Sequence, residues 1–335
     1  MIEIDGSNAG GQVVRTAVAL SALTETPVRI TNIRASRPQP GLMTQHMEGI
    51  RTIGELCGAD INGLELGSQK LQFFPNRLEP KNLRVELSTA GSVGLVLQAL
   101  LIPASQLPRP ITIDVFGGST WGKWAPPLQY MQRVLFPLIG DSTEVTIRKE
   151  GFYPKGGAIV EVESVPFRPR DLMLIDAGNI DSIRCISVAS ESLKKANVAE
   201  RQAKGTEQFL EAKMGMRPDV EVRYSDAKSS GSGLLLYATT PKTIMGADAV
   251  GEPGITAEQI GEAVAKALFM DTAEGAVDRH AADMLLPYMA IRGSGKIYVS
   301  QITKHVLANI AVIQKFLPVK FRVDGKEGGP GSITI

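Results

Sequence analysis

The pattern of hydrophobic and polar positions predicts that residues 1–79 fold as one unit with the element order βαβαββ. Val13, Ala17 and Leu20 recur at helical spacing and share one helix face, whereas the short apolar runs around them are typical of strands. The expected elements are strands at 2–4, 28–33, 61–66 and 71–74 and helices at 11–23 and 41–57.

The same order returns in residues 82–164. The expected elements are strands at 83–87, 111–115, 145–148 and 157–163 and helices at 92–101 and 127–138. An offset of about 80 residues is long for a solenoid, so it favours a duplicated compact subdomain.

A third copy of this order is split in the sequence. Its first strand is expected at 172–175, and its other elements follow only after residue 275. These later elements are helices at 276–286 and 305–316 and strands at 296–299, 319–323 and 332–335. The third repeat therefore comprises about 171–176 and 276–335.

The residues between the two halves of the third repeat have a pattern of their own. Strands are expected at 183–188, 220–223 and 234–238 and helices at 197–211 and 257–269, with an exposed serine-rich loop at 224–233. We therefore expect an α+β protein with a large three-repeat domain over 1–176 and 276–335 and an inserted small domain over 177–275.

Composition narrows the class of protein. A hydrophobic content of 43% and a charged content of 21% are ordinary for a globular protein. A net charge of +1 means that any nucleic-acid-binding surface must be local. Two cysteines are too few for a disulfide framework, and the start of the chain resembles no leader peptide. The longest apolar run, 95–104, is too short to cross a membrane, so we expect a cytoplasmic protein without a membrane partner.

His305 is the most informative residue for chemistry. It begins the amphipathic helix expected before Pro318. Free backbone N–H groups at a helix start attract phosphate, and the helix dipole disfavours imidazolium. A neutral imidazole beside a phosphate site is suited to nucleophilic attack on phosphorus. The alternative is a histidine that is simply packed at a helix start.

Two further segments precede the second helix of their repeats. Arg34 and Arg37 lead to Gln45 and His46, and two such arginines form a plausible bidentate phosphate clamp, although solvated surface arginines are the alternative. The glycine-rich tract 117–122 lets backbone approach a ligand, and Pro126 offers a rigid apolar face to a base. The alternative for this second segment is an ordinary loop.

Taken in order, these residues resemble the RNA 3′-terminal phosphate cyclases over nearly the whole chain. The matching residues are Ile4-Asp5-Gly6, Gly10-Gly11-Gln12-Val13-Val14-Arg15-Thr16, Arg34, Arg37, Pro40-Gly41-Leu42, Gln45-His46, Ala90-Gly91-Ser92, Leu97-Gln98, Ala125-Pro126-Pro127, Gly151-Phe152-Tyr153-Pro154-Lys155-Gly156-Gly157, Asp283, Leu286-Pro287 and the His305 tract that ends in Phe316-Leu317-Pro318.

The resemblance implies a fold and an activity. It implies three repeats akin to the C-terminal domain of bacterial translation initiation factor three, with a smaller inserted domain. It implies a ligase-type enzyme that converts an RNA 3′-phosphate into a 2′,3′-cyclic phosphodiester with ATP, releasing AMP and diphosphate. The implied intermediates are a covalent histidine-AMP at His305 and an RNA-phosphate-AMP anhydride. The implied partner is the RNA 3′-phosphate end, and no obligate protein partner is evident.

The resemblance also assigns binding roles to residues of this chain. The implied ATP- and AMP-binding residues are Gln98, Pro126, His280, Asp283 and Arg15. Those implied for the RNA end and the phosphates are Arg34, Arg37, Gln45 and His46. At position 280 the family can have tyrosine, and the imidazole of His280 can still stack on adenine.

The first loop departs from the family pattern. Family members have a glutamate before three glycines there, and it holds the divalent metal, Mg or Mn. This chain is two residues shorter and has no acid in the loop, which leaves Asp5 and Asn8 as weak metal ligands. Because this acid is missing, an alternative interpretation stays open, namely that the chain is a catalytically impaired relative that binds RNA in RNA processing or ribosome assembly. An enolpyruvyl transferase shares the repeated architecture but has two comparable repeat domains, whereas this chain has one set.

Overall fold

The computed structural model describes residues 1–7, 10–123 and 125–335. In this part of the chain, three four-stranded sheets share one topology, in strand orders β1-β2-β4-β3, β5-β6-β8-β7 and β9-β14-β16-β15. In each, the first two strands are parallel and the last two are antiparallel to their neighbours. The expected α+β repeats are therefore confirmed, and the likeness to the initiation factor stays an expectation.

The first repeat matches its predicted order. Its elements are β1 (Ile2–Asp5), α1 (Gly11–Thr24), β2 (Val28–Thr31), α2 (Thr44–Cys57), β3 (Asp60–Asn62) and β4 (Leu71–Phe74). The prediction placed the start of α2 three residues too early, at Gly41. Gly41 has a positive φ of 82° and Met43 is extended, with φ −103° and ψ 163°, so the helix begins only at Thr44.

The second repeat differs from the prediction in its second helix. Its elements are β5 (Leu83–Ser92), α3 (Val93–Ala104), β6 (Ile111–Ser119), α4 (Leu128–Tyr130), the π-helix η1 (Met131–Leu135), α5 (Phe136–Ile139), β7 (Glu144–Lys149) and β8 (Ile159–Ser164). The predicted single helix at 127–138 is thus one continuous helical stretch with a π-helical turn at its centre.

The third repeat consists of β9 (Met173–Leu174), α8 (Ala281–Arg292), β14 (Lys296–Val299), α9 (Lys304–Phe316), β15 (Arg322–Gly325) and β16 (Gly331–Thr334). Its first strand is interrupted, because β9 and the later residue Val277 both pair in parallel with β14. The helix predicted from Ala276 therefore starts too early. The backbone N–H groups of Ala276 and Val277 donate to Tyr298 in the sheet, and α8 begins only at Ala281.

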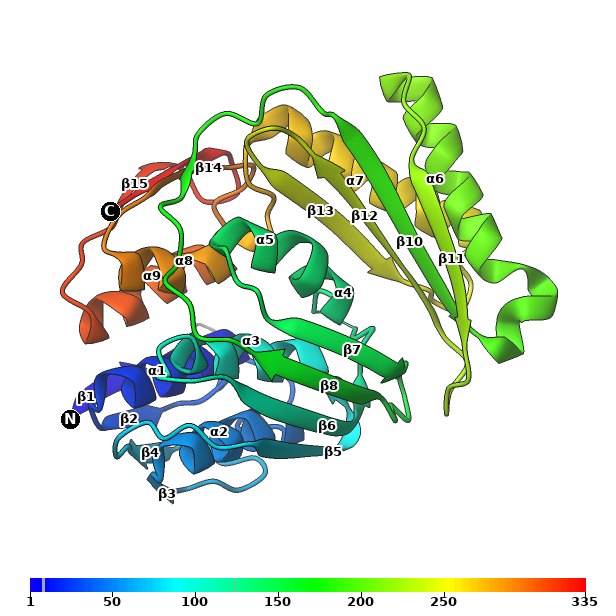
Figure 1. Cartoon of the computed structure of the whole chain (residues 1–335). Helices are drawn as coiled ribbons and strands as arrows, with labels where there is room; N and C mark the ends of the chain where they lie inside the picture. The colour runs from blue at the N-terminus through cyan, green and yellow to red at the C-terminus, as the bar shows by residue number, and fades with distance from the viewer. Residues whose placement is uncertain (8–9, 124) are drawn as a thin grey trace.

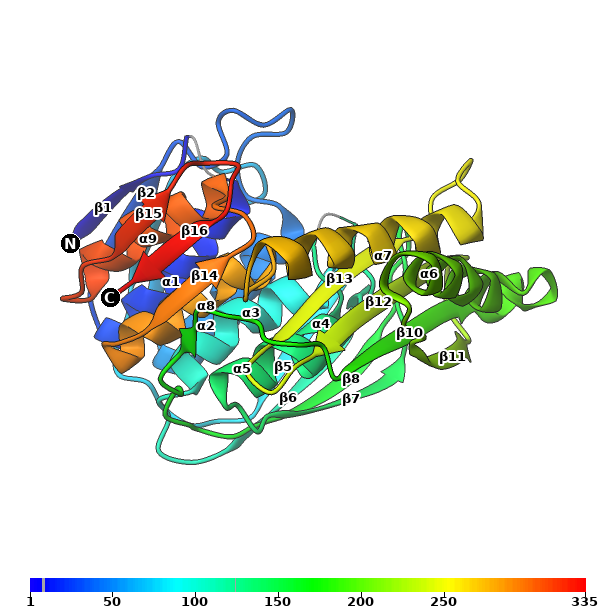
Figure 2. The ribbon, with the colours of Figure 1, turned by 90° about the horizontal axis from the view of Figure 1, so that it is seen from above.

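The inserted segment leaves and re-enters the third sheet along the line of that interrupted strand (Figures 1 and 2). It contains β10 (Ser182–Ser190), the 3-10 helix η2 (Glu191–Ala196), α6 (Val198–Met214), β11 (Asp219–Ser225), β12 (Ser232–Thr239), β13 (Ile244–Val250) and α7 (Ala257–Glu274). Its sheet has the order β11-β10-β12-β13, with α6 and α7 packed side by side on one face. A second hydrophobic core is built wholly from this segment, which supports the small domain proposed at 177–275.

The serine-rich loop expected to be exposed is instead docked on the second repeat. Ser225 and Ser229 accept hydrogen bonds from the backbone N–H groups of Glu150 and Lys155, at 3.3 and 3.0 Å. Ser229 is buried as a result. The prediction of an exposed loop therefore holds for only part of this segment. Asp226, Lys228 and Ser230 are exposed, whereas the hydroxyl groups of Ser225 and Ser229 bind backbone donors of the second repeat instead of water.

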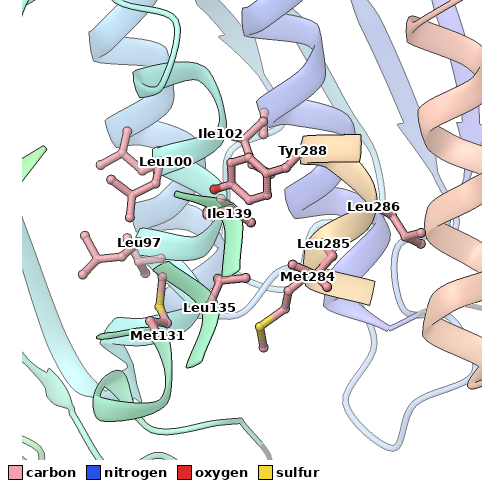
Figure 3. Packing of buried hydrophobic residues seen from close by; sticks show 14 of the residues in the cluster. Leu97, Leu100, Ile102, Met131, Leu135, Ile139, Met284, Leu285, Leu286 and Tyr288 are labelled. Carbon is pink, nitrogen blue, oxygen red and sulfur yellow. The ribbon is translucent and has the colours of Figure 1, made fainter. Parts of the chain in front are cut away.

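The main core runs through all three repeats. Figure 3 shows five of its side chains, which are Leu97 and Leu100 of α3, Met131 and Leu135 of η1, and Tyr288 of α8. These five side chains are at most 2% exposed. The described helices include none that is long and apolar enough to cross a membrane.

Candidate functional site

The site is a cleft with a volume of about 1060 Å³ on which all three repeats and the inserted segment border. In each repeat, residues at or next to the start of both helices line it. The lining residues at these starts are Gly11 and Arg15 of α1, Gln45 and His46 of α2, Ser92 and Leu95 of α3, Pro126 before α4, His280 and Asp283 of α8, and His305 of α9. Six helix N-termini therefore border one space, and the positive dipole end of a helix favours anions.

His305 is the second residue of α9, as the sequence predicts. Thr303 caps the helix by accepting a hydrogen bond from the N–H of Val306 at 3.2 Å. The imidazole lines the cleft. Burial among its neighbours and the charges of Arg15 and Arg37 lower the pKa of His305. The unprotonated, nucleophilic form is thus favoured.

Arg15 and Arg37 act on this imidazole, and a third arginine, Arg34, lines the same cleft. Arg34 donates to the Gly41 carbonyl at 2.8 Å, and Arg15 donates to Gln12 at 2.5 Å. Arg37 lies within 3.0 Å of where a Cβ on Gly10 would be. Among the described residues, none of the three forms a salt bridge within 4.0 Å. Their charge is therefore available to phosphate.

His46 lies close to Arg15 and Arg34 and can act as a neutral hydrogen-bond donor. It is 4% exposed, and its Nδ1 accepts a hydrogen bond from the Met43 N–H at 3.1 Å. Burial, together with Arg15 and Arg34, lowers the pKa of His46 to about 3. The proton of the neutral ring consequently lies on Nε2. That atom would be 2.0 Å from a Cβ at position 11, so only Gly11 permits this approach.

A second set of cleft residues is the one implied for the nucleoside. Pro126 precedes α4, and the rings of His280 and Tyr130 meet edge to face at 6.1 Å. Asp283 lies one turn beyond His280. Burial raises the pKa of Asp283 to about 6, against the opposing effects of His280 and Arg15. Gln98, 7% exposed on α3, borders the same end.

Comparisons with known proteins agree with this geometry. A family model described as RNA 3′-terminal phosphate cyclase matches residues 7–323. The chain belongs to this cyclase family. Proteins named RNA 3′-terminal phosphate cyclase from Pyrococcus abyssi and Thermococcus kodakarensis are each 40% identical, and one from Methanopyrus kandleri is 38% identical. Each comparison covers 100% of this chain and 98% of the relative.

The cleft brings together ten residues that the cyclase resemblance implied. They are Arg15, Arg34, Arg37, Gln45, His46, Gln98, Pro126, His280, Asp283 and His305. Gln45 also fixes the local backbone, because its Oε1 accepts from the Ser92 N–H at 2.9 Å. The roles of these residues stay predictions.

Asn309 is a buried residue that contacts the backbone of the site residue Asp283 and that the sequence analysis missed. It lies one turn beyond His305 and is fully buried. Its Nδ2 donates to the Asp283 carbonyl at 3.0 Å, and its Oδ1 accepts from the Thr16 hydroxyl at 2.8 Å. The Asp283 carbonyl lacks its usual helical donor because residue 287 is proline. Asn309 supplies that donor and ties α1, α8 and α9 together.

The inserted segment also contributes to the cleft. Asp248, Ala249 and Val250 of β13 and Ile260 of α7 line it, and the Lys123–Glu252 ion pair at 3.3 Å joins the second repeat to the insert. The sequence analysis assigned no strand at 244–250, because Gly246, Ala247 and Ala249 give only a weak strand signal.

Of the two metal ligands suggested by the sequence, only Asp5 lies among the described residues. Asp5 is not among the described residues that line the cleft, and its Oδ1 accepts from Ser7 and Asn32 at 3.0 and 3.2 Å. Asn8 lies outside the described residues. Among the described residues no three His, Cys, Asp or Glu side chains are grouped to hold a metal ion. The described side chains therefore do not fit a protein-held divalent metal.

Proposed function

We propose that this protein is an enzyme that converts an RNA 3′-terminal phosphate into a 2′,3′-cyclic phosphodiester in an ATP-dependent reaction. The observation that carries the proposal is one cleft that joins a helix-start imidazole, His305, to three arginines that form no salt bridge with any described carboxylate. Family membership supports the same activity.

In the first step the unprotonated imidazole of His305 attacks the α-phosphorus of ATP, and diphosphate leaves. Its lowered pKa supports this role, because a protonated ring has no free lone pair. Arg15 and Arg37 stabilise charge on the phosphate oxygens as the bond to diphosphate breaks. The product is a histidine-AMP phosphoramidate.

In the second step an oxygen of the RNA 3′-phosphate attacks the AMP phosphorus and releases His305. The resulting anhydride gives the 3′-phosphate a good leaving group. In the third step the vicinal 2′-hydroxyl attacks the 3′-phosphorus, loses its proton, and AMP departs. The neighbouring hydroxyl needs no separate binding step, since it is held beside the phosphorus at high effective concentration.

The remaining cleft residues hold the two substrates. Arg34, Arg37, Gln45 and His46 bind the RNA end, and the Nε2–H of His46 donates to a phosphate oxygen. The adenine lies between Pro126 and His280, while Gln98 and Asp283 orient the nucleotide. No step is assigned to a metal ion, because the described side chains offer no ligand set for it.

The test is labelling of the protein with ATP carrying radioactive α-phosphate. We expect an acid-labile protein adduct that disappears in His305→Ala. Lys304→Ala is the matched control, because Lys304 is the preceding residue, its side chain is 83% exposed, and it does not line the cleft. Persistent labelling of a folded His305→Ala protein would show that the nucleophile is another residue.

A second candidate function is RNA binding without catalysis, and the first loop, which lacks an acid, favours it. The two functions differ in what they recognise. A cyclase should bind an oligonucleotide with a 3′-phosphate more tightly than its 3′-hydroxyl counterpart and convert the former. Equal competition by both ends, without an adduct, would support the RNA-binding function.

A further inference from the structure

Strand β13 presents its two faces to different surroundings. Met245 and Ala247 belong to the core of the inserted segment, whereas Ile244 and Val250 pack against the main core. Side chains alternate along a strand, so Asp248 lies on the same face as Ile244 and Val250. Asp248 accordingly borders the cleft of the three-repeat part.

The carboxylate of Asp248 is the unusual group on this face. Its Oδ1 is buried and has no hydrogen-bond partner among the described residues. Its neighbour Asp278 is fully satisfied, because it accepts from the Tyr130 hydroxyl and from the backbone N–H groups of Gly246, His280 and Ala281. A buried carboxylate oxygen without a donor destabilises the protein unless a ligand supplies the donor.

Asp248 lies beside the start of α8. Gly246, two residues before it on the same face of β13, donates its N–H to Asp278, and Asp278 also accepts from the N–H of His280. The part of β13 that carries Asp248 is therefore close to His280, the residue implied to stack on adenine, and both residues line the cleft. A nucleotide whose base stacks on His280 presents that base, rather than its triphosphate, to Asp248.

We propose that Asp248 accepts a hydrogen bond from the exocyclic amine of adenine, so that the inserted segment sets the base preference of the ATP site. The amine is the one strong hydrogen-bond donor on the adenine ring. A hydrogen bond to a carboxylate is charge-assisted, which makes it strong enough to discriminate between bases. Asp248 is thus a specificity-determining residue, and this role rests on the proposed binding of ATP.

The test measures equilibrium binding of three triphosphates to the full chain carrying His305→Ala, which blocks adenylation. The ligands are ATP, purine riboside triphosphate, which lacks the amine, and 2′-deoxyATP. With Asp248 present, ATP should bind about 10-fold to 100-fold more tightly than purine riboside triphosphate, the factor typical of one charge-assisted hydrogen bond.

Asp248→Ala should reduce this ratio to less than about threefold, and Asp248→Asn should give an intermediate ratio because an amide oxygen accepts more weakly. The control is Asp226→Asn, which removes an acid of the insert that does not line the cleft and should keep the full ratio. Each variant is first checked for native unfolding behaviour.

Four results would overturn the inference. If folded Asp248→Ala keeps the same ratio of ATP to purine riboside triphosphate affinity, Asp248 does not contact the amine. A loss confined to the ATP to 2′-deoxyATP ratio would assign the contact to the ribose. Equal binding of ATP and purine riboside triphosphate with Asp248 present would also refute it, while leaving the cyclase proposal intact. Absence of any ATP binding would contradict both proposals.

Discussion

Replacing Asn309 by alanine tests whether this side chain substitutes for a missing helical hydrogen bond. The change removes the donor to the Asp283 carbonyl and the acceptor of the Thr16 hydroxyl. The carbonyl has no alternative helical donor, since residue 287 is proline. The hydroxyl can rotate toward a carbonyl of its own helix.

The magnitude follows from these two losses. One unsatisfied carbonyl costs about 1–3 kcal/mol, and a partly recovered hydroxyl adds about 0.5–1 kcal/mol. We therefore expect Asn309→Ala to lower the free energy of unfolding by roughly 2–4 kcal/mol. The measurement is urea unfolding followed by circular dichroism, with the midpoint and the slope determined separately.

A double-mutant cycle with Pro287→Ala isolates the mechanism. Alanine at 287 restores a backbone N–H that can donate to the Asp283 carbonyl. In this background Asn309→Ala should cost at least about 1 kcal/mol less than in the parent, because the carbonyl is no longer orphaned. If the two changes are additive within about 0.5 kcal/mol, the carbonyl argument is wrong.

Three other predictions follow from the cleft. The rate of adenylation should fall as the pH is lowered, with a midpoint below the ordinary histidine pKa of about 6.5. The reason is that burial and two arginines lower the pKa of His305, and only the unprotonated ring attacks. A midpoint at or above that value in a pH–rate profile would contradict this prediction. Gly11→Ala should reduce adenylation at least about tenfold, since the new methyl group would lie 2.0 Å from Nε2 of His46. The helical control is Gly49→Ala, where the added Cβ has no neighbouring atom within 4 Å, and this change should stabilise the protein by about 0.5–1 kcal/mol. Equal activity of the two variants would refute the steric argument. Binding of a single-stranded 3′-phosphate end should weaken with salt, and Arg37→Ala should reduce the slope of log K against log salt by about 0.7; an unchanged slope in a salt titration would show that Arg37 does not contact phosphate.

The repeated part of the fold could be predicted because its signals are local. Val13, Ala17 and Leu20 lie on the buried side of α1, and the apolar stripe of α9 includes the buried residues Val306, Ile310 and Ile313. Each unit buries one face of its helices, so helical periodicity alone locates them. Topology was also accessible, since the same order of elements appears three times.

The errors arose where long-range contacts override local pattern. Ala276 and Val277 have apolar side chains next to a helical pattern in the sequence. In the structure, however, they form backbone hydrogen bonds with β14 and continue the line of β9. The small residues of β13 carry no strand signal of their own, and their conformation is set by pairing with β12. Asp248 could not be assigned to the site for the same reason.

The position of the insertion explains how the cleft obtains residues from outside the repeats. The repeats direct helix N-termini and arginines toward the cleft, which makes it suited to phosphate, and they also supply Pro126 and His280. Because the insertion interrupts the first strand of the third repeat, its chain re-enters immediately before His280. Asp278 then links the Gly246 backbone of β13 to the start of α8 through one carboxylate. The segment that carries Asp248 is thereby fixed next to His280, so the residues proposed to bind the base are connected to the repeats that carry the phosphate-binding arginines.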